Sequence, residues 1–123
     1  MPLSHFLIVF IGGGLGATAR FALSSALNNN PRFHGFPWGV FCCNLIGCFC
    51  IGLAAGWIKA HHPHWIHPLF VTGVLGGFTT FSSFALDTHQ LIQNQAFGLA
   101  ATYSLGTLVI GTVLCYIAYQ ISS

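Results

Sequence analysis

Residues 73–84, GVLGGFTTFSSF, place the side chains most suited to ion chemistry inside an otherwise apolar stretch. Adjacent glycines, paired threonines and serines, and three phenylalanines do not favour an uninterrupted helix. In lipid, a broken helix is tolerated only where protein or a water-filled cavity covers the freed backbone groups. Loosened carbonyls and helix ends at such breaks often bind ions. The segment therefore predicts a protein that handles an ion inside a membrane.

A second polar group lies in the preceding apolar stretch. Asn44 is surrounded in sequence by Phe41, Cys42, Cys43 and Leu45. An amide at the centre of a membrane needs a hydrogen-bonding partner or a cavity to face. Two roles stay open for Asn44, a bond from helix to helix and a contact with a substrate.

The last apolar stretch carries a row of polar or small residues at a spacing of four. Tyr103, Thr107, Gly111 and Cys115 form this row, which predicts one face of a helix. Ser104 and Thr112 flank the row. Hydroxyls in membrane helices commonly bond to their own backbone, but donors along one stripe could also solvate a passing anion.

Phe81 and Phe84 lie one helical turn apart, on one face if that part is helical. An aromatic ring has a negative face and a positive edge, so edges turned inward can contact an anion. The alternative is ordinary packing. Their position beside Gly76, Gly77 and the threonines strengthens the case for an anion contact, and both interpretations stay open.

These residues require a membrane to hold them. Only 3% of the chain is charged, where soluble proteins have about a quarter. Hydrophobic residues make up 54%, and the mean hydropathy is +0.76. The net charge of +2 and the absence of a basic run exclude a nucleic-acid partner. A soluble subunit wholly buried in an oligomer is the alternative class. The charged residues are Arg20, Arg32, Lys59 and Asp87.

About 20 apolar residues cross a bilayer as a helix, and four stretches qualify. We expect one four-helix transmembrane domain over residues 1–123, all-α, with the third helix broken near its middle. A cleaved signal peptide is an alternative for the first stretch, although no Lys or Arg precedes its apolar part. The expected spans are residues 3–27, 38–59, 65–91 and 96–121.

The positive charges give almost no orientation signal. One side of the membrane would carry Lys59, and the other would carry Arg32 and Arg20. This balance favours insertion in both directions, with opposite copies pairing into an antiparallel homodimer. A fixed topology set by other factors is the alternative. GxxxG spacings at residues 12–16, 52–56 and 73–77 predict close helix packing.

The remaining residue patterns give weaker evidence of function. Residues 12–17 fit G-x-G-x-x-A, but a dinucleotide fold needs a preceding strand and an acidic residue about 20 positions on. No nucleophile, base and orienting group come together, so we do not expect an enzyme. A histidine-rich loop could bind a metal at the surface, or simply form a polar interfacial loop. Its members are His61, His62, His64 and His67.

Three segments resemble the CrcB/Fluc fluoride channels of bacteria, and the resemblance extends over nearly the whole chain. They are GGGLGATAR at 12–20, WGVFCCNLIGCF at 38–49 and TGVLGGFTTFSSFALD at 72–87. The resemblance implies a dual-topology antiparallel homodimer in the bacterial inner membrane. It implies two anion pathways through which fluoride leaves the cytoplasm passively, which protects the cell from fluoride.

The resemblance also implies roles for single residues. A structural sodium ion at the dimer centre would be held by backbone carbonyls of Gly76 and Thr79. Arg20 matches the arginine that ends the glycine-rich motif, and its role stays open. The residues that would line the anion pathway are Asn44, Phe81, Phe84, Tyr103 and Thr107.

The chain departs from the family pattern on its last span. Gly111 stands where related chains often carry serine, and Cys115 where they can carry threonine. The far end of the polar row is therefore in question, and we expect Thr112 to replace it only if the helix is rotated.

Two other classes of membrane protein fit parts of the pattern. A small proton-coupled drug exporter also has four spans, but it needs an acid inside the membrane. This chain has no glutamate, and Asp87 lies near a span end. A membrane scaffold would explain the glycines but not the break with its threonines and phenylalanines.

Overall fold

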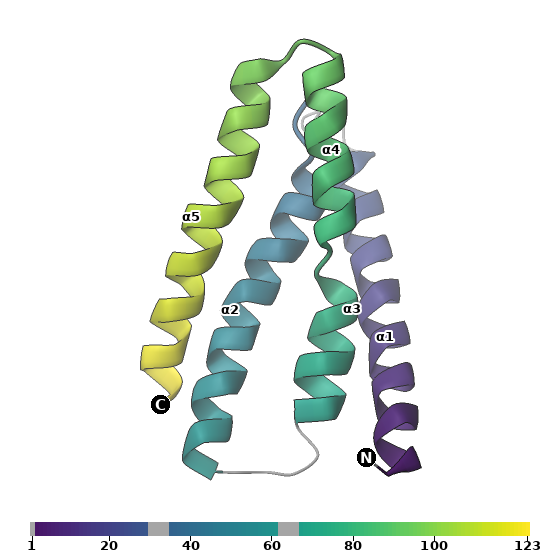
Figure 1. The fold of residues 1–123 in the computed structure, drawn as a ribbon, viewed down its shortest axis with the longest axis vertical. Helices are drawn as coiled ribbons and strands as arrows, with labels where there is room; N and C mark the ends of the chain where they lie inside the picture. The colour runs from purple at the N-terminus through teal and green to yellow at the C-terminus, as the bar shows by residue number, and fades with distance from the viewer. Residues whose placement is uncertain (1, 30–34, 62–66) are drawn as a thin grey trace.

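The computed structural model describes residues 2–29, 35–61 and 67–123, and every regular element in these ranges is helical (Figure 1). Four helices are long and apolar enough to cross a membrane: Leu3–Asn28, Trp38–His61, Leu69–Gln93 and Phe97–Ser122. The third of them contains three shorter elements. The elements are α1 (Leu3–Asn28), α2 (Trp38–His61), η2 (His67–Leu75), α3 (Gly76–Phe78), α4 (Phe81–Gln93) and α5 (Phe97–Ser122).

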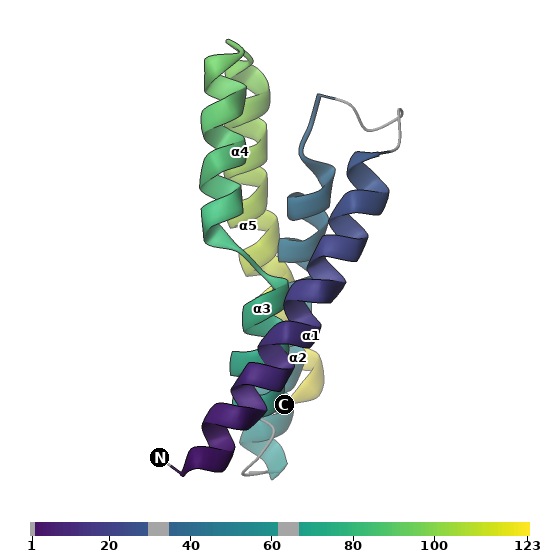
Figure 2. The same cartoon turned by 90° about the vertical axis from the view of Figure 1, so that its right-hand side faces the viewer.

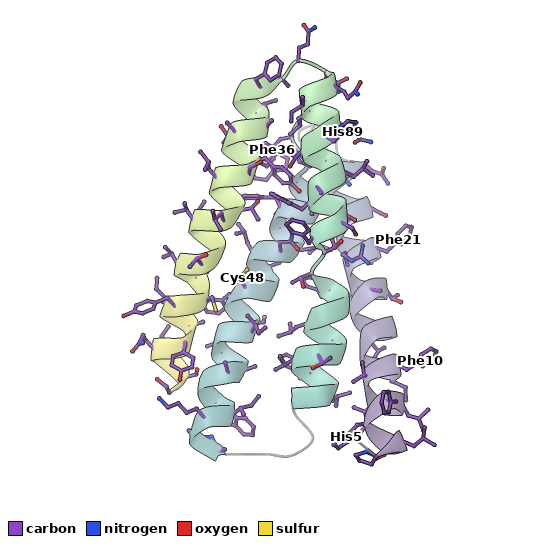
Figure 3. All side chains as sticks on the ribbon, in the orientation of Figure 1. His5, Phe10, Phe21, Phe36, Cys48 and His89 are labelled. Carbon is purple, nitrogen blue, oxygen red and sulfur yellow. The ribbon has the colours of Figure 1, made fainter. Side chains whose placement is uncertain are left out.

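Large apolar side chains cover the outside of the bundle. Phe10 and Phe21 on α1 are 79% and 74% exposed and point away from the other helices (Figure 3). A helix that is apolar on all sides needs a lipid or protein environment all round. The outer surface of this molecule is therefore suited to hydrocarbon.

The helices pack in two groups. α2 lies parallel to α5, whereas α1 lies along η2 and α3 (Figure 1). Turned by 90°, α4 and α5 stay side by side and lean away from the upper part of α1 (Figure 2). Both chain termini lie at the same end of the bundle, as an even number of crossings requires.

The glycine pairs lie where these groups touch. A Cβ on Gly77 would collide with the Gly13 carbonyl of α1, and one on Gly16 with the Val74 carbonyl. On the other side, Gly52 meets the backbone of Cys115 on α5. The predicted close packing is confirmed, because small residues let the backbones approach closely in lipid.

The predicted break of the third span is also confirmed. Thr79 and Thr80 are extended, with φ/ψ of −88°/155° and −152°/123°, and they separate α3 from α4. The Thr80 hydroxyl caps α4 by accepting from the Ser83 amide at 3.2 Å. The break thus carries its own start signal for the next helix.

The helix bounds differ from the expected spans at the ends. α1 and α2 end at Asn28 and His61, and α4 continues to Gln93. The turn to α5 follows at Gln95, whose φ is 58°. The expected start of the third span at residue 65, like Arg32, His62 and His64, lies outside the described residues. Residues 12–17 lie within α1, so no strand precedes them, as a dinucleotide site would need.

Candidate functional site

A groove of about 660 Å³ runs beside the broken span, between α2, α4, α5 and the η2–α3 segment. Apolar side chains such as Ile51, Leu75 and Leu108 form much of its wall. No Lys, Arg, Asp or Glu is among its lining residues, which all belong to the described ranges. Its polar wall consists of Asn44, Cys48, Thr79, Thr80, Ser104, Thr107 and Thr112.

Asn44 of α2 clamps the break. Its Nδ2 donates to the Thr80 carbonyl at 3.1 Å, and its Oδ1 accepts from the Thr80 amide at 2.9 Å. The side chain is 9% exposed, and it also belongs to the groove wall. The amide replaces backbone bonds that a continuous helix would make. Both roles left open for Asn44 by the sequence are compatible with this position.

The clamp frees carbonyl oxygens on the third span. In a continuous helix the Thr80 amide would donate to Gly76 and the Ser83 amide to Thr79. Here they donate to Asn44 Oδ1 and to Thr80 Oγ1 instead, and no described backbone amide replaces them across the break. Neutral carbonyl oxygens suit hard cations, so the donor set fits the ion expected at Gly76 and Thr79.

Arg20 reaches the same break from α1. Its Nε donates to the Gly77 carbonyl at 3.1 Å, between the two carbonyls just described. The Arg20 carbonyl is itself 3.8 Å from the Cys43 thiol, which donates to it from α2. Arg20 therefore connects three segments and is not part of the groove wall. A structural role in holding α3 follows from this geometry.

Phe81 and Phe84 both line the groove from α4, with ring centroids 5.7 Å apart. Phe81 is 80% exposed, whereas Phe84 packs on Tyr103 with a centroid distance of 5.0 Å. The structure thus brings the two rings together on one face. The exposed face of Phe81 needs a cover from lipid or from a second copy.

Tyr103 lies behind the groove and does not line it. Its side chain is fully buried in an aromatic cluster with Phe36, Phe41 and Phe84 (Figure 3 labels Phe36). Its hydroxyl donates to Asp87 Oδ2 at 3.3 Å. Asp87, the single acidic residue of the chain, is therefore bound to a tyrosine and does not line the groove. A proton-coupled exporter would need an acidic side chain in that wall.

The face of α5 that lines the groove is not the row expected from the sequence. Thr107 lines it, but Gly111 is buried against α2 and Cys115 lies outside the wall. The wall runs instead along Ser104, Leu108 and Thr112, spaced by four residues. Thr112 reaches the groove without any rotation of the helix. The same spacing of four residues is present in the sequence at 104, 108 and 112, but the apolar Leu108 at its centre gave no signal of a polar row.

The chain matches a known protein family over most of its length. The family model "CrcB-like protein, Camphor Resistance (CrcB)" matches residues 7–119. The chain belongs to the CrcB family. This membership and the four apolar helices make it a multi-pass membrane protein.

The curated relatives cover nearly the full chain. "Fluoride-specific ion channel FluC 2" of Nitrobacter hamburgensis is 46% identical over 114 residues, which are 89% of each chain. "Fluoride-specific ion channel FluC" of Methylobacillus flagellatus is 38% identical over 119 residues, covering 94% of this chain and 91% of the relative. The protein of that name in Helicobacter acinonychis is 43% identical over 111 residues, covering 88% and 87%.

Proposed function

We propose that this CrcB-family protein is a fluoride-selective ion channel of the bacterial inner membrane. The observation that carries the proposal is the groove with uncharged donors and two phenylalanine rings beside the broken span. Its relatives are named fluoride-specific ion channels. Passive exit of fluoride lowers its level in the cytoplasm and protects the cell. The activity involves no chemical step, so no catalytic residue is assigned.

The groove would replace the water that the ion loses on entering the membrane. Fluoride holds its water strongly, so a pathway must offer donors and ring edges in its place. A charged side chain at the bilayer centre costs at least about 2.5 kcal/mol. Asn44, Phe81 and Phe84 offer an amide proton and ring edges to the ion without that cost. Thr107 lines the same wall, and Tyr103 supports Phe84 from behind.

The direction of flow comes from the membrane and not from fuel. Hydrogen fluoride enters as a neutral acid and dissociates in the near-neutral cytoplasm. An inside-negative potential then drives the anion out, worth about 2.3 kcal/mol per 100 mV.

The working unit in this proposal is an antiparallel homodimer with a central sodium ion. Gly76 and Thr79 offer two carbonyls per chain, fewer than the six or more oxygens typical of hard cations such as calcium. A second, inverted copy would double the set and cover Phe81. The bound cation would raise the local positive potential and hold the two breaks together.

Fluoride efflux from proteoliposomes tests the function. We expect loss of trapped fluoride without a proton gradient, and much slower loss of chloride. Efflux that requires a proton gradient would favour an exporter, and no efflux at all would favour a scaffold. Repeating the assay without sodium tests the cation separately: equal flux and equal dimer stability in both conditions would contradict the sodium site.

A further inference from the structure

The hydroxyl groups of the groove differ in whether their proton is free. Thr79, Thr107 and Thr112 donate to carbonyls four residues earlier in the chain, at 3.0, 2.7 and 2.6 Å. A hydroxyl has one proton, so a threonine bound in this way presents only lone pairs to an ion. In the pair of hydroxyls of Thr80 and Ser82, at 3.3 Å, either oxygen can donate. All four threonines of the wall are thus hydrogen-bonded, and three of them have given their only proton to the backbone.

Ser104 and Cys48 are different. Both line the groove, and neither makes a hydrogen bond to any described residue. Ser104 lies at the level of the aromatic cluster, next to buried Tyr103. Cys48 lies between α2 and α5, about one turn beyond Asn44 on α2 (Figure 3). Asn44 has a second amide proton besides the one given to Thr80.

Cys48 also explains the missing side chain at Gly111. A Cβ built on Gly111 would lie 3.1 Å from Cys48 Sγ, so the thiol occupies the space beside the helix there. Asn44 precedes Cys48 by about one turn on α2, and α2 runs parallel to α5. The row that Gly111 interrupts on α5 is thus continued by a side chain from α2.

We propose that Ser104 and Cys48 are anion-contacting donors of the pathway, on either side of the spare amide proton of Asn44. Along α5, Ser104 and Gly111 are separated by a rise of about 10 Å, so the three donors serve successive positions of the ion. This inference rests on the proposed fluoride channel. The donors it assigns differ from the row of Tyr103, Gly111 and Cys115 expected from the sequence.

The two donors differ in strength. A hydroxyl donates a stronger hydrogen bond than a thiol, which is a weak donor. Ser104 therefore contributes more to fluoride passage than Cys48 does. At each position we expect the order of fluoride flux to be Ser above Cys above Ala.

The first experiment measures fluoride efflux of S104A and S104C in proteoliposomes. Ser104→Ala lowers the flux about tenfold, the value of one hydrogen bond to a charged group, and Ser104→Cys gives an intermediate rate. Thr102→Val is the matched control, since Thr102 is exposed on the same helix and bonds to Gly98 away from the groove. Its flux stays at the wild-type rate. Gel filtration confirms that every variant keeps the wild-type assembly.

The second experiment tests the exchange between Cys48 and Gly111. Cys48→Ala lowers the flux, and Cys48→Ser matches or exceeds the wild type. Gly111→Ser alone weakens the α2–α5 packing, because its Cβ meets the thiol. In the double variant C48A/G111S the new hydroxyl enters the vacated space, and both thermal stability and flux recover relative to the respective single variants.

The outcomes separate the inference from the function itself. A wild-type protein that passes no fluoride overturns the proposed channel. A conducting wild type with full flux in S104A or in C48A overturns the assignment of that residue and leaves the channel intact. If the Gly111 and Cys48 substitutions act independently, the shared position of their side chains is wrong.

Discussion

At the scale of single residues, the site depends on Asn44, which both hydrogen-bonds the backbone at the break and lines the groove. Its Nδ2 donates to the Thr80 carbonyl, and its Oδ1 accepts from the Thr80 amide. A buried carbonyl that loses its donor costs about 1–3 kcal/mol. The same side chain thus fixes the geometry of the break and presents a proton to the groove.

Asn44→Asp tests this double role. Aspartate keeps an acceptor for the Thr80 amide, but it removes the donor to the Thr80 carbonyl and adds a negative charge to the wall. We expect fluoride efflux to fall by about tenfold or more, with the dimer retained. Phe81→Ile, which removes a ring edge from the same wall, acts in the same direction.

Asn28→Asp is the control for the added charge. Asn28 accepts from the Gly39 amide at 3.2 Å, where α1 ends and α2 begins, and it is not part of the groove wall. Its efflux stays at the wild-type rate. Full flux in both N44D and F81I would contradict the assigned pathway.

At the scale of elements, the broken third span is held from two sides. Asn44 reaches it from α2 and Arg20 from α1. The close approach of α1 and α3 brings Arg20 within reach of the Gly77 carbonyl, and that approach needs glycine at position 77. Packing of the glycine face and geometry of the break are therefore coupled.

Gly77→Ala tests the coupling. The added methyl group meets the Gly13 carbonyl and the Ala17 amide, so the helices must separate. Overpacking of this kind costs about 1–3 kcal/mol, and we expect a lower melting temperature together with reduced flux.

Gly14→Ala is the matched control on the neighbouring helix. A Cβ there has no neighbour within 4 Å among the described atoms. Alanine favours the helix by about 0.5–1 kcal/mol over glycine, so the variant is neutral or slightly more stable. Equal stability of G77A and the wild type would show that the two helices do not pack this tightly.

At the scale of the whole molecule, the near-balance of positive charges is the feature to test. Three lysines at the terminal end, in P2K/S4K/S123K, make insertion with cytoplasmic termini dominant. If the channel is an antiparallel dimer, this variant alone conducts little fluoride. Labelling of both termini from each side of the membrane measures the orientation.

A partner with the opposite bias completes this experiment. N29K/Q93K adds charge at the other end of the bundle, where α1 and α4 end. Co-expression of the two variants restores the flux, because each supplies one orientation. Full conduction by a singly oriented variant would contradict the antiparallel unit.

Much of the fold was predictable because lipid leaves few choices. A chain with 3% charged residues and four apolar stretches forms membrane helices, since every backbone group must be satisfied within its own segment. The broken third span followed from the glycines and threonines at 76–80. The expected ion ligands Gly76 and Thr79 remain a prediction, supported by the diverted amides of Thr80 and Ser83.

The wall of the groove was less predictable. A spacing of four selects one helix face, but it does not say whether that face meets a cavity or another helix. Tyr103 and Gly111 face protein, whereas Ser104 and Thr112 face the groove. The role of Arg20, open in the sequence, became a bond to the Gly77 carbonyl.

The sequence by itself determined the number of membrane spans, the place of the break and the family, because these follow from local composition and spacing. Only the tertiary structure decided which side of α5 lines the groove and which hydroxyl protons are free. Both depend on how parallel α2 and α5 are rotated about their axes, and the contacts of Cys48 with Gly111 and of Gly52 with Cys115 set that rotation between residues more than 60 positions apart.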